Sequence, residues 1–547
     1  MINKLKSIQD SLIAKLTEKN IGGILFISSF ILFFILLIKG FPDISLRYDE
    51  IFTMHLVKDT IGNIIYQTAM DVHPPLHYFI VKAFISIGHL FHSSFSDIFL
   101  AKLSSATPIL LLMIFSWKYL KKDIGYLAAG LFSLSVVLMP QFDYYMADVR
   151  MYSWGMLFLT LAFYSAYRIS IDGSWKNYAL LIFFGILGEY TQYYCSVTLF
   201  AVYLVLFAWL ALKNEVMKVK KLILSGIISV AAFIPWMGIL LNQISYVSNS
   251  FWIAEFNSKT LLQTVWYVLS SRKVGDTTYT LVHGAKTEWE GVVLLILIVL
   301  ILAISLYYLF KENISLNSLK RIGKINFLTF SALITVLEVL LGMLLSDVIG
   351  KEILHVRYIV IGLALFWLSV CIIISKTFKK SKPVFLVLMF LFLLGGGLNL
   401  SFSFHKMDVN TGFAHSIQDV LKLIDPDDLV IDGDLSTTGF RELLMSHPDE
   451  NTYIGQLDTY WEPPFMNVYS SQHNMSIFGG NLMSRVNKTL ESGHNVWIYG
   501  ISNGHNNLMT IRNSQWGYLD FYKVKAYTLK KAIIPGDNGA IYEIIAN

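Results

Sequence analysis

Segments of roughly 20 predominantly apolar residues recur along this chain from residue 22 to residue 400. The hydrocarbon core of a bilayer is about 30 Å thick, and an α-helix needs about 20 residues to cross it. Inside a bilayer no water is present to pair with exposed backbone groups, so such segments can be buried there as helices. The 547-residue chain is 55% hydrophobic and only 15% charged, which is too apolar for one soluble globule. We therefore predict an all-α polytopic membrane protein over most of the chain.

Counting these segments predicts about 11 membrane-spanning helices. One of them, 177–190, is short for a helix that crosses a bilayer. Residues 74–91 also have helical periodicity, but His77, Lys82 and His89 interrupt it. We expect this helix to lie at the membrane interface, with the two histidines as interfacial side chains rather than ligands. The predicted spans are 22–40, 98–117, 124–142, 151–168, 177–190, 195–212, 222–241, 291–310, 326–346, 358–375 and 383–400.

Lysine and arginine residues cluster in segments that alternate with the predicted spans. Short loops rich in these residues stay on the cytoplasmic side of a membrane. The N-terminus is therefore predicted in the cytoplasm, and the formal charge of +5 reflects membrane orientation rather than a nucleic-acid partner. The basic segments are the N-terminal tail, 118–123, 168–176, 213–221, 311–324 and 376–383. The segments then predicted outside the cytoplasm are 41–97, 143–150, 189–194, 242–290, 347–357 and the tail from about 401.

The C-terminal tail differs in composition from the rest of the chain. Residues 405–547 contain 16 acidic and 10 basic residues, which is typical of a water-soluble domain. Segments typical of strands, at 429–432 and 495–500, alternate with segments typical of helices, at 415–424 and 437–445, so we predict a small α/β fold. The predicted parts are a cytoplasmic N-terminal segment 1–21, a multi-span transmembrane domain 22–400 with a long outer loop 41–97, and an extracytoplasmic soluble α/β domain 401–547.

Ionisable residues gather at the predicted outer ends of the spans. Such residues are costly near a membrane, so a cluster of them marks a candidate functional site. Carboxylates can take a proton from an attacking hydroxyl or amine, and the donors of Arg and His match the oxygens of a leaving phosphate. The residues are Arg47, Asp49, Glu50, Asp71, His73, Asp143, Asp148, Arg150, Glu189, Lys351, Glu352, His355 and Arg357.

Five motifs follow one another along the chain: YDEIF at 48–52, DVHPPLHY at 71–78, ADVRMYS at 147–153, GEYTQYY at 188–194 and VRYIVIG at 356–362. Together they resemble the motifs of multi-span glycosyltransferases of the C-type (GT-C) fold, which take sugars from polyprenyl-phosphate carriers. This group includes protein O-mannosyltransferases and the bacterial aminoarabinose transferase of lipid A. The resemblance covers roughly residues 20–375 and depends most on the Asp-Glu pair and the His-Pro-Pro turn.

The resemblance implies a role for several residues. Asp49 matches the base that deprotonates the acceptor, which then displaces the polyprenyl phosphate from the anomeric carbon in one inverting step. Glu50 is the second predicted catalytic residue. Two roles are open for it: orienting the site or pairing with Arg47. His73 stands where relatives have a lysine that contacts the carrier phosphate, and Gln192 stands where many bacterial relatives have histidine. The residues predicted to bind the donor phosphate are His73, Arg150, Arg357 and Tyr358, and the supporting residues are Arg47, Asp148 and Glu189.

Other interpretations of the same residues stay open from sequence alone. Asp49 is also a favoured cap for a helix that begins at Glu50. Arg150 and Arg357 could instead extend to lipid headgroups. Carboxylates and imidazoles of the first outer loop also suit a divalent cation, although their spacing matches no recognised metal motif, so no cofactor is firmly predicted. The residues concerned are Asp49, Glu50, Asp71 and His73.

Two other functions compete with a monosaccharide transferase. A flippase would place paired charges at mid-membrane, where Glu338 fits, and a polymerase or ligase of lipid-linked glycans would also need arginine at the outer face. The predicted partners are a polyprenyl-phosphate-linked sugar donor, an extracytoplasmic glycan, lipid or protein acceptor, and the bilayer, with no nucleic acid. The abundance of Lys, Ile and Asn favours a bacterial source and undecaprenyl phosphate as carrier. Cys195 and Cys371 lie in different spans, so we expect no disulfide.

Overall fold

The structure, a computed structural model, forms two compact units along the chain. The helical unit comprises Met1–Phe41 and His73–Phe404, and the second unit comprises Pro42–Val72 and His405–Asn547. The residues that the structure describes are 17–40, 46, 48–247, 326–350, 352–421, 427–432, 452–454, 488–499, 522–527 and 541–546, together with isolated residues between 264 and 307 and at 425.

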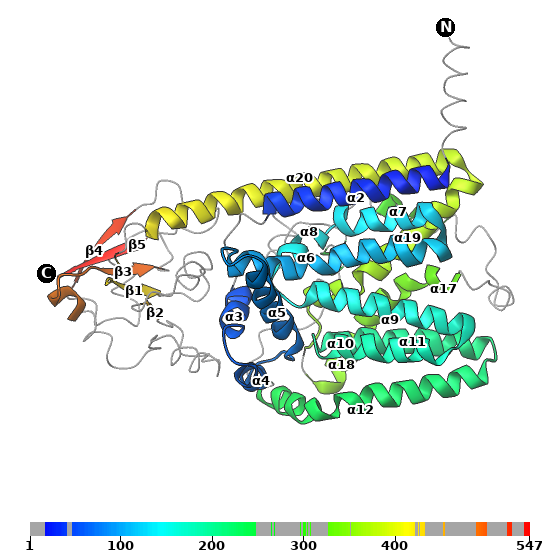
Figure 1. The fold of residues 1–547 in the computed structure, drawn as a ribbon, viewed down its shortest axis with the longest axis horizontal. Coiled ribbons are helices and arrows are strands. Elements are labelled where there is room, and N and C mark those ends of the chain that lie inside the picture. The colour runs from blue at the N-terminus through cyan, green and yellow to red at the C-terminus, as the bar shows by residue number, and fades with distance from the viewer. Residues whose placement is uncertain are drawn as a thin grey trace, which may run out of the picture. The chain divides into compact units, whose positions relative to one another are not determined.

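Most long helices in the described part of the helical unit lie side by side along one common direction (Figure 1). Helices α9 and α19 form its centre, because most of their side chains are buried. The helices are α2 (Glu18–Gly40), α5 (Leu76–Phe91), α6 (Asp97–Phe115), η1 (Ser116–Leu120), α7 (Lys121–Leu138), α8 (Phe142–Ala147), α9 (Tyr152–Asp172), α10 (Trp175–Glu189), α11 (Tyr194–Leu212), α12 (Val216–Val247), α17 (Asn326–Thr329), α18 (Ser331–Ile349), η3 (Val356–Ile359), α19 (Val360–Lys380) and α20 (Lys382–Leu421).

Every predicted span except 291–310 coincides with a described helix, and 291–310 lies outside the described residues apart from isolated positions. Seven apolar stretches of the described residues are long enough to cross a membrane. The chain is therefore a multi-pass membrane protein. Helix α10, with 15 residues, is short for a span, as expected. Helix α5 corresponds to the predicted interfacial helix 74–91 and is also too short to count as a span.

The longest apolar stretch, Asp97–Leu138, is a hairpin of two helices. The hydroxyl of Ser116 donates to the carbonyl oxygen of Ala129 at 2.8 Å, and that of Ser133 donates to Met113 at 3.5 Å. These pairs require α6 and α7 to run antiparallel. Gly125 lies within the reversal and has a φ of 86°, which a side chain would disfavour. The stretch thus supplies two crossings, as the predicted spans 98–117 and 124–142 require.

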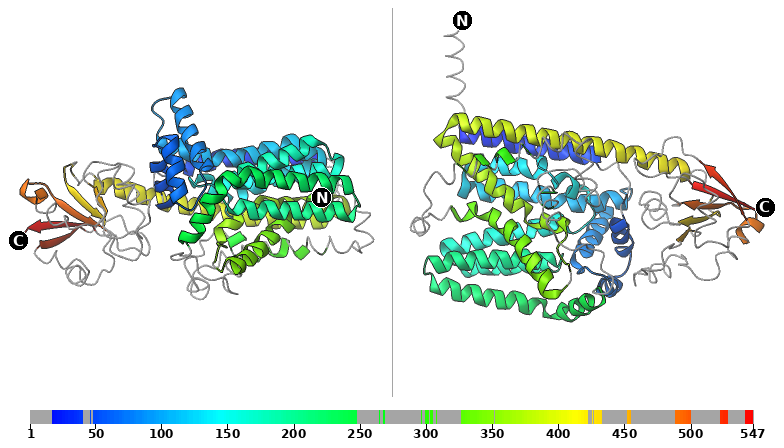
Figure 2. Two further views of the ribbon diagram at one scale, coloured as in Figure 1. Left: turned by 90° about the horizontal axis from the view of Figure 1, so that it is seen from below. Right: turned by 180° about the vertical axis from the view of Figure 1, so that it is seen from behind.

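Glycines bring α2 and α7 into backbone contact. A Cβ atom at Gly22 would lie 2.2 Å from the carbonyl oxygen of Tyr126, and one at Gly130 would lie 2.3 Å from the carbonyl oxygen of Gly22. Small residues of this kind let membrane helices approach closely and gain dispersion energy. On its other side α2 runs alongside the first part of α20 (Figures 1 and 2), where the Lys39 ammonium lies 5.2 Å from the centre of the Phe404 ring.

The described part of the second unit includes two short helices, the end of α20 and a mixed sheet. Helices α3 (Tyr48–Leu56) and α4 (Ile61–Met70) precede the Pro-Pro turn. Strands β1, β2 and β3 are parallel, and β5 pairs antiparallel with both β3 and β4, giving the order β2-β1-β3-β5-β4. The C-terminal part therefore has the predicted α/β character, although the predicted helix 437–445 lies outside the described residues. The strands are β1 (Leu429–Asp432), β2 (Thr452–Ile454), β3 (Val496–Tyr499), β4 (Tyr522–Tyr527) and β5 (Ile541–Ala546).

Helix α20 is longer than the sequence predicted. The predicted span 383–400 and residues 415–421 of the predicted helix 415–424 are parts of this one 40-residue helix, and residues 422–424 lie outside the described residues. No proline occurs between residues 384 and 425, so the backbone hydrogen bonds of the span can continue without a break. The division between the two units falls inside this helix, after Phe404.

Candidate functional site

Tyrosine rings join the helix ends that carry the predicted donor-binding residues. The ring of Tyr358, at the start of α19, lies 6.4 Å from Tyr152 of α9 and 5.4 Å from Tyr194 of α11. Tyr152 in turn lies 5.0 Å from Tyr145 of α8. The segments 143–152, 189–194 and 352–358 therefore meet at one end of the helical unit, although they are far apart in sequence (Figure 1).

The loop between α8 and α9 presents Asp148 and Arg150 from a tight turn. The backbone N–H of Asp148 ends α8 by donating to Tyr144, and the N–H of Arg150 donates to the carbonyl oxygen of Asp148 at 2.7 Å. Asp148 is 5% exposed and Arg150 is 4% exposed. A buried guanidinium cannot reach lipid headgroups, so the lipid-facing interpretation of Arg150 was wrong.

Arg357 is fixed by its neighbour in the segment before α19. The Nδ1 atom of His355 accepts hydrogen bonds from the backbone N–H and from Nε of Arg357, both at 3.3 Å. This assignment makes Nδ1 an acceptor, so its proton is carried on Nε2 when the ring is neutral. Glu352 anchors the same segment, because its Oε1 accepts from the hydroxyl of Ser346 at 2.8 Å and from the N–H of Leu354 at 3.1 Å. Arg357 itself is half-buried.

Tyr267 joins this group, although no sequence argument had selected it. Its hydroxyl is hydrogen-bonded to that of Tyr145, and its carbonyl oxygen accepts from the side-chain amide of Gln141 at 2.8 Å. Burial raises the pKa of Tyr267, Asp148 raises it further and Arg357 opposes the rise. The phenol is therefore protonated at neutral pH, with charges of both signs near it. Tyr267 belongs to the long predicted loop 242–290, in which no motif distinguishes one aromatic residue from another.

The Pro-Pro turn anchors two of these loops through the first turn of α5. His73 is half-buried and immediately precedes the buried Pro74. The N–H of Leu76 donates to the carbonyl oxygen of Tyr190 at 3.0 Å, and Nε2 of His77 lies 3.4 Å from the carbonyl oxygen of Val149. The prediction of His77 as an interfacial side chain was therefore wrong, because the residue is completely buried. His89, near the other end of α5, is half-buried and bonded to Asp97 at 2.7 Å.

The turn between α10 and α11 carries the buried carboxyl of Glu189. Glu189 is 8% exposed, and its Oε2 has no hydrogen-bond partner among the described residues. Gln192, in the same turn, accepts a hydrogen bond from the N–H of Tyr194 and so supports the start of α11.

The Asp-Glu pair lies in the second unit, in the first turn of α3. This helix begins at Tyr48, so Asp49 lies inside its first turn and does not cap a helix that begins at Glu50. The carbonyl oxygen of Asp49 accepts from the Thr53 hydroxyl at 3.0 Å, and its side chain is half-buried. Glu50 is 2% exposed. The partial positive charge at a helix N-terminus stabilises carboxylates there. Arg47 lies outside the described residues.

Two further predictions concern metal ions and Glu338. In the described part of the chain, no group of three or more His, Cys, Asp or Glu side chains is arranged to hold a metal ion.

Glu338 is completely buried in α18, and the hydroxyl of Thr198 donates to its Oε2 at 2.9 Å. A Cβ atom at Gly362 would lie 2.5 Å from the same oxygen, so the glycine makes room for the carboxyl. Glu338 thus connects α18 to α11 and α19. Cys195 and Cys371 are buried free thiols.

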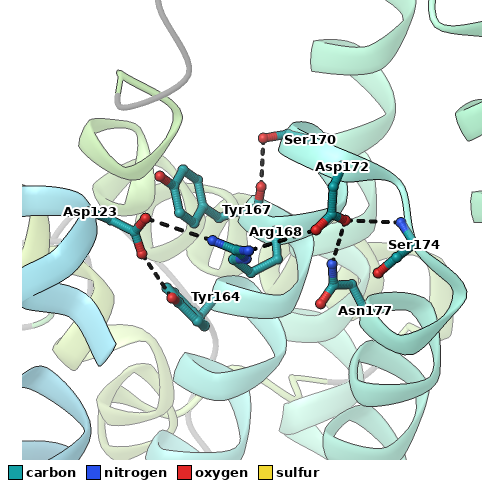
Figure 3. Close-up of polar contacts among 8 residues, drawn as sticks. All are labelled: Asp123, Tyr164, Tyr167, Arg168, Ser170, Asp172, Ser174 and Asn177. Carbon is teal, nitrogen blue, oxygen red and sulfur yellow. Dashed lines mark hydrogen bonds and ion pairs between the residues drawn. The ribbon is translucent and has the colours of Figure 1, made fainter. Parts of the chain in front are cut away.

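The opposite end of the helical unit holds a separate polar network (Figure 3). The guanidinium of Arg168 lies 3.8 Å from Asp123 and 3.7 Å from Asp172, and Tyr164 donates to Asp123 at 2.8 Å. Asp172 also accepts from Asn177 at 2.7 Å. These contacts join the start of α7, the end of α9 and the start of α10. Arg168 therefore has a structural role.

Comparison with solved structures identifies the architecture. Two crystal structures of ArnT from Cupriavidus metallidurans, one in the apo state and one bound to undecaprenyl phosphate, align with TM-scores of 0.52 and 11% sequence identity. Each alignment covers 95% of this chain and 97% of the other. The chain has the GT-C fold.

The alignments with the two ArnT structures extend over nearly the whole of both chains. A crystal structure of the Archaeoglobus fulgidus oligosaccharyltransferase, in complex with Zn and sulfate, aligns with a TM-score of 0.43 and 10% identity over 94% of this chain and 72% of the other. No protein-family model and no curated protein sequence matches the chain.

Proposed function

We propose that this protein is an inverting glycosyltransferase that moves a monosaccharide from a polyprenyl-phosphate carrier to an extracytoplasmic acceptor. The observation that supports the proposal is that the segments 143–152 and 352–358, which carry Asp148, Arg150, Arg357 and Tyr358, meet in a helical unit with the GT-C fold. Similar architecture is found in ArnT, which has been crystallised with undecaprenyl phosphate. A carrier of the same chemistry is therefore our choice of donor.

Basic and phenolic groups would hold the donor phosphate. Guanidinium groups form charge-assisted hydrogen bonds with phosphate oxygens, and these bonds strengthen as negative charge develops on the leaving group. Arg150 and Arg357 supply two such groups. His73 precedes the Pro-Pro turn, and the helix after this turn is hydrogen-bonded to Val149 and Tyr190. Tyr358 would add a hydroxyl donor. No general acid is needed, because a phosphate ester leaves readily without protonation.

Asp49 would act as the base for the acceptor. Its carboxylate is half-buried, and the adjacent Glu50 is buried, so Glu50 is suited to orienting rather than to contacting bulk solvent. The acceptor hydroxyl or amine loses its proton to Asp49 as its oxygen or nitrogen attacks the anomeric carbon, and the C–O bond to phosphate breaks. We propose Arg47, Asp148 and Glu189 as supporting residues.

We place the C-terminal domain 401–547 and the outer loop 41–97 on the extracytoplasmic side, with residues 1–21 in the cytoplasm. Basic segments such as 118–123 and 376–383 support this orientation. Lys121 lies 4.7 Å from the ring centre of Trp117 and Lys213 lies 5.4 Å from that of Trp209, a pairing that suits anchoring at a lipid headgroup layer. The acceptor would then be a cell-wall polymer, a glycolipid or a protein.

A flippase or a glycan polymerase is the alternative function. Glu338 is the mid-span charge that a flippase would use, but its hydrogen bond to Thr198 and its contact with Gly362 give it a role in helix packing. A polymerase would use a donor with an extended glycan. Neither alternative accounts for the acidic pair at the start of α3 as directly as a transferase does.

The test offers purified protein a panel of polyprenyl-phospho-monosaccharides with an envelope extract as acceptor. We expect free polyprenyl phosphate to be released with one donor, together with a labelled acceptor. Transport of the intact donor across a vesicle without release would indicate a flippase, and release only from donors with several sugars would indicate a polymerase. Repeating the assay with a chelator tests the divalent-cation alternative.

A further inference from the structure

His77 is a buried polar residue without a role in the mechanism proposed above. It lies in the first turn of α5, directly after the Pro74–Pro75 turn, and none of it is exposed. Its Nε2 lies 3.4 Å from the carbonyl oxygen of Val149. A carbonyl oxygen can only accept, so Nε2 carries the proton and Nδ1 is a bare acceptor. Among the described residues, Nδ1 has no hydrogen-bond partner.

The surroundings of His77 favour the uncharged ring. Burial and the charge of Arg150 lower the pKa of His77 from 6.5 to about 3, and the hydrogen bond to Val149 only partly opposes them. A neutral imidazole can lie near a guanidinium without repulsion, whereas a lysine would repel it. An apolar side chain would fill the same space without burying an unsatisfied acceptor, so packing alone does not explain a histidine here.

The contact with Val149 bears directly on Arg150. The N–H of Arg150 donates to Asp148 at 2.7 Å, so the backbone between Asp148 and Arg150 is held by its own turn on one side and by His77 on the other. Arg150 is buried and directly follows Val149, so a shift of this backbone would move the start of its side chain. We propose that His77 is a positioning residue that holds Val149 and so aims Arg150 at the donor phosphate. The proposal rests on the function proposed above, since it requires Arg150 to bind the carrier.

Two substitutions at His77 separate positioning from packing. In His77→Gln the amide nitrogen can still donate to Val149, whereas His77→Leu fills the space without a donor. We expect His77→Leu to raise the donor KM about tenfold with little change in acceptor KM, and His77→Gln to stay within about threefold of wild type. His89→Leu, on the same helix, is the control and should leave both constants unchanged. Equal losses in the Leu and Gln variants would overturn the proposal.

A double-mutant cycle with Arg150→Ala tests whether His77 acts through Arg150. In that background, His77→Leu should cause no further loss of binding to polyprenyl phosphate, measured with the lipid alone and with melting temperatures as a check of folding. Additive losses would overturn the proposal. Wild-type protein that is folded but neither binds nor releases polyprenyl phosphate would refute the proposed function itself. Binding by wild type that persists unchanged in His77→Leu would refute only the role of His77.

Discussion

The guanidinium of Arg357 is held by the ring of His355, whose Nδ1 accepts a hydrogen bond from Nε of Arg357 at 3.3 Å. Removing this guanidinium in Arg357→Ala should lower kcat/KM for the donor by about 10–100-fold, because a hydrogen bond to a charged group contributes about 1.5–3 kcal/mol. The acceptor KM should change little. The measurement varies donor and acceptor concentrations separately in the release assay.

Arg168→Ala provides the matched control for this prediction. Arg168 lies between Asp123 and Asp172 at the opposite end of the helical unit (Figure 3), so its loss should leave the donor KM unchanged. An Arg357→Ala variant whose donor dependence equals that of wild type would return Arg357 to the role of a lipid-headgroup contact.

Individual site residues were predictable where a motif surrounds them. The sequence motifs selected Arg150, Arg357 and Tyr358, and the structure joins the segments that carry them through the rings of Tyr152 and Tyr358. They could not select Tyr267, because its contacts to Tyr145 join positions 122 residues apart and depend on the fold. The burial of His77 was also missed, because its helical segment is amphipathic enough to suggest an interface, and the partner that covers it is distant in sequence.

At the level of helices, the contact between α2 and α7 depends on Gly22, whereas the adjacent Gly23 faces open space. A Cβ atom at Gly22 would meet backbone atoms of Tyr126 and Leu127, whereas one at Gly23 would meet nothing within 4 Å. Gly22→Ala should therefore lower stability by about 1–3 kcal/mol through overpacking. Gly23→Ala should be neutral or stabilising by up to about 1 kcal/mol, because alanine favours helix more than glycine does.

The measurement is the thermal unfolding midpoint of each variant in the same detergent. Backbone atoms cannot rotate away from a new methyl group as a flexible side chain can, so the two variants should differ in sign or clearly in size. Equal midpoints for Gly22→Ala and Gly23→Ala would show that α2 does not pack against α7 as closely as described.

Helix positions followed from hydropathy because membrane crossing imposes a length on each apolar segment. Helix ends were less predictable. The start of α3 was placed two residues late, and the helix 415–424 was not recognised as the end of α20, since local sequence gives no signal for where tertiary contacts extend a helix. Short strands such as β2 were missed because their partners, not their composition, define them.

For the whole molecule, the proposed orientation places Lys122 in the cytoplasm and His405 outside. Both side chains are exposed, and the two native cysteines are buried, so single introduced cysteines can be labelled against a low background. In intact cells a membrane-impermeant maleimide should label His405→Cys and should label Lys122→Cys only after permeabilisation. The reverse labelling pattern would show that the orientation is opposite to the proposed one and that the proposed chemistry takes place in the cytoplasm.

The central claim is that Asp49 is the base that deprotonates the acceptor. A comparison of variants tests this claim most directly. Release of free polyprenyl phosphate is measured for wild type, Asp49→Asn and Asp59→Asn, all shown to be folded by their unfolding midpoints. Asp59 is a control because it accepts hydrogen bonds from Asn63 and Gln67 and has no proposed catalytic role. We expect Asp49→Asn to lose about 10²–10⁴-fold in rate, as loss of a general base does, and Asp59→Asn to remain near wild type. Turnover by Asp49→Asn at the wild-type rate would contradict Asp49 as the base.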